Sequence, residues 1–146
     1  MQYDNLKIEN QLCFPLYVCS KEIVKRYTPY LEKLDLTYTQ YITMMILWEE
    51  KNICVKELGK RLYLDSGTLT PLLKKLESKG YVTRTRDTKD ERNMNISITN
   101  KGLSLRDEAA NIPECVAKGI NISPEDGAIL YKLLYNLIDE MEDKND

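Results

Sequence analysis

The sequence has no histidine and few cysteines. Without an imidazole, neither a Ser-His nor a Cys-His pair can form, because the base that would activate the nucleophile is absent. The cysteines Cys13, Cys19, Cys54 and Cys115 include no C-x-x-C spacing, so the only zinc site left open is an unpatterned set of all of them. We therefore expect neither a metal nor any other cofactor.

Long hydrophobic runs are also missing. No apolar stretch approaches the ~20 residues of a membrane helix, and residues 1–5 lack the basic start of a secretory signal. With 42% hydrophobic and 30% charged residues, the chain has enough apolar side chains to bury a core. We expect one compact domain with helical extensions, no membrane contact, and a cytoplasmic location in which the cysteines rest as thiols.

The formal net charge is only −2, which by itself does not favour binding to nucleic acid. The charges are unevenly distributed, however: residues 1–55 carry −1, residues 56–101 carry +5 and residues 102–146 carry −6. A basic middle between acidic ends favours local contact with phosphates. On charge alone, a merely uneven solvated surface stays open as the alternative.

Hydrophobic spacing divides the chain into helical segments. Apolar residues recur at intervals of three and four near residues 10–34, 38–50, 55–62, 66–80, 101–112 and 124–141. Thr37 and Gln40 have the spacing of a capping box, and Gly80 is expected to end its helix. Residues 81–86 and 94–99 alternate with a period of two, which predicts a two-stranded ribbon. The predicted fold is mainly α with a small β-ribbon, and its middle is a winged helix-turn-helix.

The second helix of that motif is the candidate for reading DNA. Its start, Ser66-Gly67-Thr68-Leu69-Thr70-Pro71, is where a recognition helix meets base edges in the major groove. We expect contacts with DNA from five side chains of this helix, namely Ser66, Thr68, Thr70, Lys74 and Lys75. Simple helix capping and solvated lysines are the alternatives.

The predicted ribbon tip is rich in arginine. We expect Arg84, Arg86 and Arg92 to contact DNA, because a wing arginine can enter a narrow minor groove where A·T-rich sequence concentrates negative potential. Asp90 lies close to Arg92 in sequence and is a candidate to hold its guanidinium in a bidentate pair. A charged hairpin is often only a solvated one, but its position after a helix-turn-helix favours DNA.

These motifs carry a family resemblance. The stretch from Leu64 to Glu77, followed by Gly80 and by Asp90-Glu91-Arg92, resembles the MarR family of dimeric winged-helix regulators. Within that family, the start Glu9-Asn10-Gln11-Leu12-Cys13-Phe14 and the stretch Thr37-Tyr38-Thr39-Gln40-Tyr41 look like the organic hydroperoxide resistance repressors. The resemblance covers most of the chain.

The resemblance implies a repressor that binds an inverted-repeat DNA operator as a homodimer. It implies a dimerisation helix with the sensing cysteine in residues 1–36, a DNA-binding lobe in residues 37–100 and C-terminal dimerisation helices in residues 101–146. Surplus apolar surface on the last predicted helix also favours a dimer. A regulator of this kind is not an enzyme.

The resemblance further implies that a hydroperoxide oxidises Cys13 and so ends repression. Tyr27 and Tyr38 match the tyrosines that hydrogen-bond the thiolate across the dimer, and Tyr17 matches a further tyrosine nearby. Pro15 departs from some relatives, which have an aliphatic residue there, so the helix geometry around Cys13 is left open.

A second cysteine of some members lies near the C-terminal dimer helices, as Cys115 does. We therefore hypothesise a Cys13–Cys115 bridge between subunits, with a sulfenic acid or a mixed disulfide with a low-molecular-weight thiol as the other possible end states. Cys19 and Cys54 are expected to be packing residues.

Two other functions stay open. A thiol peroxidase would consume hydroperoxide catalytically and would not need a basic wing. A MarR-type repressor released by a lipophilic or phenolic ligand, bound between the dimer helices and the winged lobe, would leave Cys13 as an ordinary packing residue.

Overall fold

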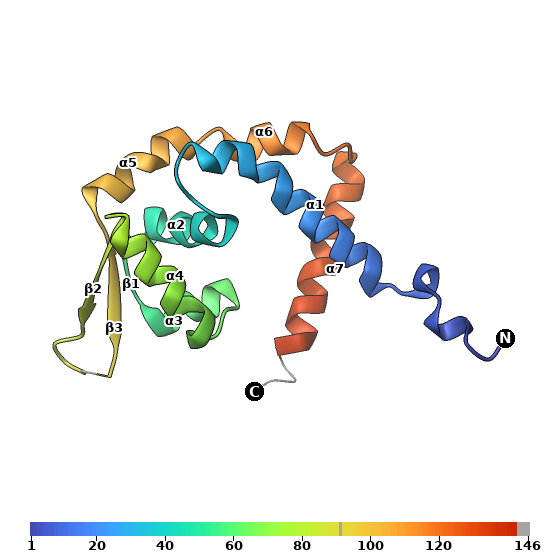
Figure 1. The fold of residues 1–146 in the computed structure, drawn as a ribbon, viewed down its shortest axis with the longest axis horizontal. Coiled ribbons are helices and arrows are strands. Elements are labelled where there is room, and N and C mark those ends of the chain that lie inside the picture. The colour runs from blue at the N-terminus through green and yellow to red at the C-terminus, as the bar shows by residue number, and fades with distance from the viewer. Residues whose placement is uncertain (91, 143–146) are drawn as a thin grey trace. The chain divides into compact units, whose positions relative to one another are not determined.

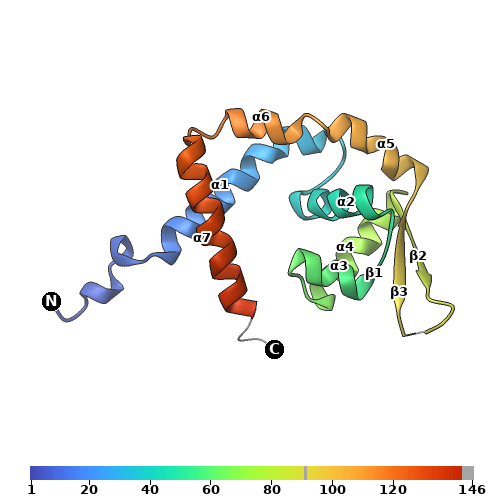
Figure 2. The same cartoon turned by 180° about the vertical axis from the view of Figure 1, so that it is seen from behind.

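The computed structural model describes residues 1–90 and 92–142. Glu91, part of the wing motif quoted above, and the last four positions of the expected C-terminal segment lie outside the described residues. The chain divides into two compact units, Met1–Pro113 and Glu114–Asp146. Figure 1 and Figure 2 show the fold from two opposite sides.

The first unit begins with two short 3₁₀ turns, η1 (Asp4–Leu6) and η2 (Ile8–Asn10), before α1 (Cys13–Glu32). The predicted helix near residues 10–34 therefore starts later than expected. Side chains explain the delay: Asn10 donates to the carbonyl of Asp4 at 2.8 Å, and Gln11 donates to that of Lys7 at 2.9 Å. Such local bonds compete with helical ones. Cys13 thus becomes the first residue of α1.

Three helices form the core of the first unit: α2 (Tyr38–Glu50), α3 (Val55–Leu62) and α4 (Ser66–Ser78). The predicted capping box is confirmed, because the backbone N–H of Gln40 donates to Thr37 Oγ1 and the N–H of Thr37 donates to Gln40 Oε1 at 3.0 Å. Gly80 follows α4 with a positive φ of 81°, as a helix-ending glycine does. The core consists largely of leucines and includes Leu47, Leu58, Leu69, Leu73 and Leu76.

The sheet has three strands rather than the two predicted. β1 (Asn52–Cys54), β2 (Val82–Arg86) and β3 (Met94–Ile98) are antiparallel in the order β1-β3-β2, with Ile53 paired to Ile96. β1 is only three residues long, too short to display an alternating pattern. It anchors the ribbon beside α3, and β2 and β3 extend beyond it as the wing (Figure 1).

The C-terminal helices are α5 (Asn100–Ala109), α6 (Ile112–Lys118) and α7 (Pro124–Glu142). The helix predicted over residues 101–112 ends at Ala109 because Pro113 has no N–H to donate to the Ala109 carbonyl. Ser123 Oγ caps α7 by accepting the N–H of Asp126 at 3.1 Å. α7 has no buried side chain, and Ile129, Leu133 and Met141 are more than half exposed. No helix in the described part of the chain is both long enough and apolar enough to cross a membrane.

Candidate nucleic-acid interface and thiol site

The start of α4 is fixed by a carboxylate cap. Asp65 Oδ1 accepts the backbone N–H of Thr68 at 2.8 Å, and this bond lowers the pKa of Asp65 from its ordinary value. A carboxylate is well placed at the positive end of a helix. The cap thus sets the direction in which the first turn of α4 points.

One face of α4 is buried and the other is open. Leu69, Leu72, Leu73 and Leu76 pack into the core. The expected DNA-contacting side chains of this helix are all exposed, namely Ser66, Thr68, Thr70, Lys74 and Lys75. Pro71 is also exposed, between Thr70 and Lys74 on the outer face, and was not predicted to contact DNA. This face offers hydroxyl groups, a proline ring and two ammonium groups to a groove.

The wing arginines occupy different environments, although their sequence context did not separate them. Arg84 Nε donates to Glu77 Oε1 of α4 at 3.1 Å, and its side chain is only 23% exposed. Arg92 is 91% exposed and pairs with Asp90 at 3.2 Å. Arg86, at the end of β2, is exposed. Arg84 therefore ties the wing to α4, whereas Arg92 projects into solvent.

The predicted contact between Asp90 and Arg92 is present, but it is not a bidentate fork. One oxygen, Asp90 Oδ1, accepts both the side-chain Nε–H of Arg92 at 3.2 Å and its backbone N–H at 3.1 Å. The carboxylate therefore holds both the Arg92 backbone and the Nε atom of its guanidinium. The two terminal nitrogens of that guanidinium stay available for an outside partner.

The cysteines are all free thiols in different settings. Cys13 is exposed at the first position of α1, and Pro15 lies in the same first turn, where a proline is tolerated. Cys115 is half-buried on α6. Cys19 is exposed, so the packing role expected for it is wrong within this protomer. Cys54 is half-buried and caps α3, because its sulfur accepts the N–H of Glu57 at 3.5 Å.

Tyr27 and Tyr38 meet in an aromatic cluster between α1 and α2. Their ring centroids are 5.0 Å apart, and the Tyr41 ring is 5.7 Å from that of Tyr27. Burial raises the pKa of Tyr38, with a smaller contribution from Tyr27, and raises that of Tyr41 to about 12. Both phenols therefore stay protonated at neutral pH and keep a proton to donate.

The cluster is far from Cys13 of the same chain. Tyr27 follows Cys13 by fourteen positions on α1, which is about 21 Å along a helix axis. Tyr38 contacts Tyr27 and is therefore remote as well. Tyr17 is one turn from Cys13 on the same helix and is 61% exposed. Of these three tyrosines, Tyr17 is the one that lies within a helical turn of the thiol in its own protomer.

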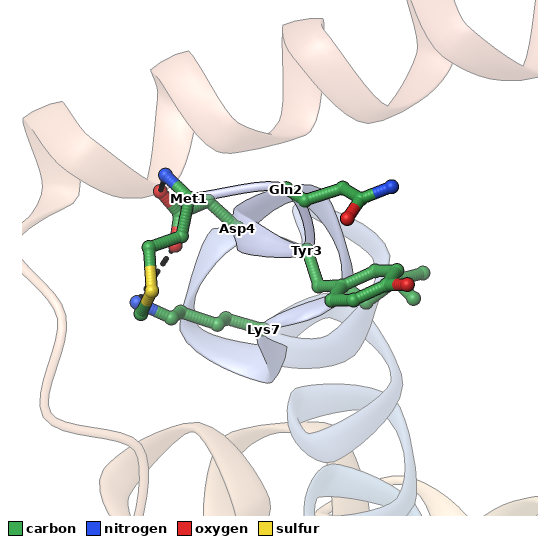
Figure 3. A pocket seen from close by; sticks show the side chains of 6 residues that line it. Met1, Gln2, Tyr3, Asp4 and Lys7 are labelled. Carbon is green, nitrogen blue, oxygen red and sulfur yellow. Dashed lines mark hydrogen bonds and ion pairs between the residues drawn. The ribbon is translucent and has the colours of Figure 1, made fainter.

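Two hollows bear on ligand binding. Figure 3 shows one of about 470 Å³ at the N-terminus, where Asp4 lies between the Met1 amine and the Lys7 ammonium, each at 2.9 Å. A smaller one of about 200 Å³ lies between α2 and α5 and is lined by Tyr41, Trp48 and Arg106 among others. In residues 1–90 and 92–142, no group of three metal-binding side chains comes together.

This chain is similar to known transcriptional regulators, as a winged-helix fold would lead one to expect. The family model "Transcriptional regulator SarA/Rot" matches residues 25–109. The organic hydroperoxide resistance transcriptional regulator of Bacillus subtilis (strain 168) is 45% identical, with 99% of this chain and 98% of that protein covered. The regulator SarZ of Staphylococcus aureus (strain USA300) is 47% identical, with 100% and 99% covered.

A solved structure, that of reduced AbfR bound to DNA, matches with a TM-score of 0.77 at 29% identity, covering 97% of this chain and 99% of that one. AbfR has also been solved overoxidised and bound to DNA, at 30% identity, and in a disulfide form. These relatives are transcriptional regulators. They confirm the expectation of a regulator rather than an enzyme, and they weigh against the thiol peroxidase. The chain belongs to the MarR/SarA family of winged-helix transcriptional regulators.

Proposed function

We propose that the protein is a redox-sensing repressor that binds an inverted-repeat operator as a homodimer and releases it when a hydroperoxide oxidises Cys13. The observation that carries this proposal is the placement of Tyr27 and Tyr38. They form a contacting aromatic pair too far from Cys13 of their own chain to bond it, while Cys13 is exposed at the start of a helix. A second copy would bring the two halves of the sensor together.

The DNA-contacting surface is the outer face of α4 together with the wing. Thr70, Lys74 and Lys75 enter the major groove with Ser66 and Thr68 at its edge, and the exposed Arg92 reaches the adjacent minor groove. Arg84 acts differently, by holding the wing against α4 through Glu77. The likeness to AbfR, which has been solved on DNA, supports DNA binding as the role of this fold.

The dimer is formed by the N-terminal segment 1–36 and the C-terminal segment 101–146, leaving residues 37–100 as the DNA-binding lobe. Support comes from apolar side chains that the protomer leaves uncovered: Leu12 is 83% exposed on the first segment and Leu133 is 59% exposed on α7. Reading two successive major grooves requires recognition helices about 34–36 Å apart, so the dimer interface sets the register on DNA.

The chemistry begins with the Cys13 thiolate. In the dimer, a tyrosine hydroxyl of the partner donates a hydrogen bond to this sulfur. The thiolate attacks the hydroperoxide: an S–O bond forms, the O–O bond breaks, and the alkoxide leaves and takes a proton to become an alcohol. Sulfur loses two electrons and the peroxide gains them, which leaves a sulfenic acid.

A disulfide is the end state that we favour. The sulfenic acid condenses with a second thiol, so that an S–S bond forms and water leaves. That thiol is Cys115 of the partner or a low-molecular-weight thiol. Because overoxidised AbfR has been solved on DNA, added oxygen need not displace DNA in that relative, whereas a covalent link at the interface would change the spacing of two lobes.

The test is DNA binding by fluorescence anisotropy, on a duplex carrying an inverted repeat from upstream of the protein's own gene. Wild type and the matched control Cys19→Ser, which alters an exposed cysteine of the same helix, should release DNA with cumene hydroperoxide and rebind after dithiothreitol. Cys13→Ser should stay bound. Release of Cys13→Ser by the peroxide would refute the proposal.

Two further measurements separate the end states. After peroxide, a non-reducing gel should show a covalent dimer for wild type and none for Cys115→Ser. A dimer band that survives in Cys115→Ser excludes the Cys13–Cys115 bridge. Mass spectrometry of the oxidised protein incubated with cysteine would then reveal a mixed disulfide.

The α2–α5 hollow supports a second function, release by a small ligand. Its aromatic and apolar lining with Arg106 at one side suits a phenol or an aromatic acid. Salicylate titrated under reducing conditions would release DNA if this route operates, and Arg106→Ala would abolish the effect. An oxidation sensor would not respond.

A further inference from the structure

The turn between α1 and α2 is joined to the end of α4 by one lysine. Lys79 Nζ donates to the carbonyl of Asp35 at 2.6 Å and to Gln40 Oε1 at 3.0 Å, and it lies 3.5 Å from the Asp35 carboxylate. Two of the three ammonium protons are thus used in hydrogen bonds to this turn, and the nearby carboxylate adds an ion pair. Although lysine is normally solvated, this side chain is only 23% exposed.

The acceptor on α2 is shared with the cap of that helix. Gln40 is 3% exposed, and its Oε1 accepts the Thr37 N–H as well as Lys79. Tyr38, which donates to the thiolate in the proposed function, is the first residue of α2 and lies inside this capping box. Any displacement of Tyr38 therefore moves the atoms that Lys79 binds.

A second bond runs parallel to the first. The hydroxyl of Tyr81, a residue that is 6% exposed, donates to the carbonyl of Leu34 at 2.9 Å. Lys79 and Tyr81 flank Gly80, which ends α4 and leads into β2. The recognition helix and the wing thus meet at the point where both bonds attach. We call Lys79 and Tyr81, with their acceptors on residues 34–40, the turn latch.

We propose that the turn latch transmits the state of the Cys13 sulfur to α4 and the wing, with Lys79 and Tyr81 as positioning residues. This inference rests on the proposed function. A sulfur that no longer accepts from Tyr38 leaves that tyrosine to move with the start of α2. The latch passes the movement to the end of α4, so the reading face turns relative to the partner's. Without the latch, the direct packing of α2 against α4 would be the link left between that movement and the recognition helix.

The test compares the affinity for operator DNA before and after oxidation. A change that weakens both redox states equally cancels in the ratio of the two affinities, so the ratio measures how far oxidation alters DNA binding. For wild type we expect a ratio on the order of five- to a hundredfold. Lys79→Met should bring the ratio close to one, while the rate at which cumene hydroperoxide consumes the Cys13 thiol stays unchanged. Lys79→Arg, which keeps the charge and the donors, should restore most of the ratio.

Lys101→Met is the matched control. Lys101 Nζ donates to the Lys79 carbonyl at 2.9 Å and lies 5.4 Å above the Tyr81 ring, so it occupies the same corner, but among the described residues it makes no hydrogen bond or ion pair to the α1–α2 turn. Its replacement removes one positive charge, as Lys79→Met does, and lowers the affinity of both redox states alike. The wild-type ratio should persist.

Each outcome decides. If Lys79→Met and Tyr81→Phe both retain the wild-type ratio, the latch does not transmit. If both lose reduced-state binding and show lower melting temperatures, the latch is only architectural, and the proposal is again overturned. If wild type itself shows a ratio of one, oxidation does not alter DNA binding and the proposed function is wrong. That result differs from a wild-type response that Lys79→Met leaves unchanged, which refutes the latch alone.

Discussion

The winged lobe and the C-terminal helix of this protein contrast in how far each completes its own packing. In the lobe, α4 buries four leucines, and Met44, Leu47, Leu58 and Ile96 are fully inaccessible. On α7 no side chain is buried, although this helix also carries apolar residues at helical spacing, among them Ile129, Leu130, Leu133 and Leu137. The lobe buries its own core, whereas the apolar side chains of α7 stay uncovered in the protomer and would be covered by a second copy in the proposed dimer. The difference separates residues that maintain the fold from residues that maintain the assembly.

The largest effect should come from the core of the lobe. Leu76 is fully buried, so Leu76→Ala should reduce the free energy of unfolding by about 2–5 kcal/mol. Leu133→Ala on α7, where the side chain is 59% exposed, should instead weaken dimerisation and make the urea midpoint depend more strongly on protein concentration. Urea melts at two protein concentrations check both. Losses of stability that were equal in the two variants and independent of protein concentration would contradict the contrast between the lobe and α7.

Gly102 and Gly127 show the same difference between the first unit and α7 in how closely the backbone is packed. A Cβ at Gly102 would clash with the Tyr81 carbonyl oxygen, so Gly102→Ala forces α5 away from the start of β2 and should cost about 1–3 kcal/mol or more. At Gly127 of α7 nothing lies within 4 Å of the added Cβ. Gly127→Ala should therefore stabilise its helix, by up to roughly 1 kcal/mol. Thermal unfolding followed by circular dichroism gives both signs. A stabilising Gly102→Ala would show that this close approach is not real.

Helix caps could be predicted from the sequence, whereas pairing between distant segments could not. Local signals were sufficient at Thr37, Gln40 and Gly80, because a cap or a helix end is decided by residues three or four apart. The short strand β1 was missed because its pairing partner Ile96 lies forty-three positions after Ile53. Pro113 was a readable signal for the end of α5 that the hydrophobic pattern concealed.

The candidate site shows the same limit. Exposure of the α4 side chains could be predicted from the leucine period, but the difference between Arg84 and Arg92 could not. Both are wing arginines in sequence, and only the fold brings Glu77 to Arg84. Lys79 was missed altogether, because its acceptors Asp35 and Gln40 are about forty positions earlier in the chain. The reach of Tyr27 and Tyr38 across a dimer stays a prediction.

A smaller effect should separate the two wing arginines. Arg92→Ala removes a 91% exposed side chain, so it should leave stability unchanged and lower the slope of log affinity against log salt by about one. Arg84→Ala breaks the pair with Glu77 and should shift α4 relative to the wing, with a loss of stability and little change in the salt slope. Anisotropy titrations over a range of salt concentrations measure the slopes. A reduced slope for Arg84→Ala with unchanged stability would reverse the two roles.

The smallest effect concerns pH and compares two helix caps. Asp65 caps α4 with a carboxylate whose pKa is lowered by the Thr68 N–H, whereas Ser123 caps α7 with a hydroxyl that does not titrate. Because the folded pKa of Asp65 is below its unfolded value, its contribution to stability is present above the unfolded pKa and is lost as pH falls through the folded one.

We therefore expect amide exchange in the first turn of α4, relative to that of α7, to increase as the solution is acidified below the unfolded pKa of aspartate, about 3.9. Asp65→Ser gives α4 the same kind of cap as α7 and should remove this difference between the helices. If the Asp65→Ser protein kept the acid-dependent exchange in α4, the cap could not be its cause. The acid sensitivity of the lobe would then belong to carboxylates other than Asp65.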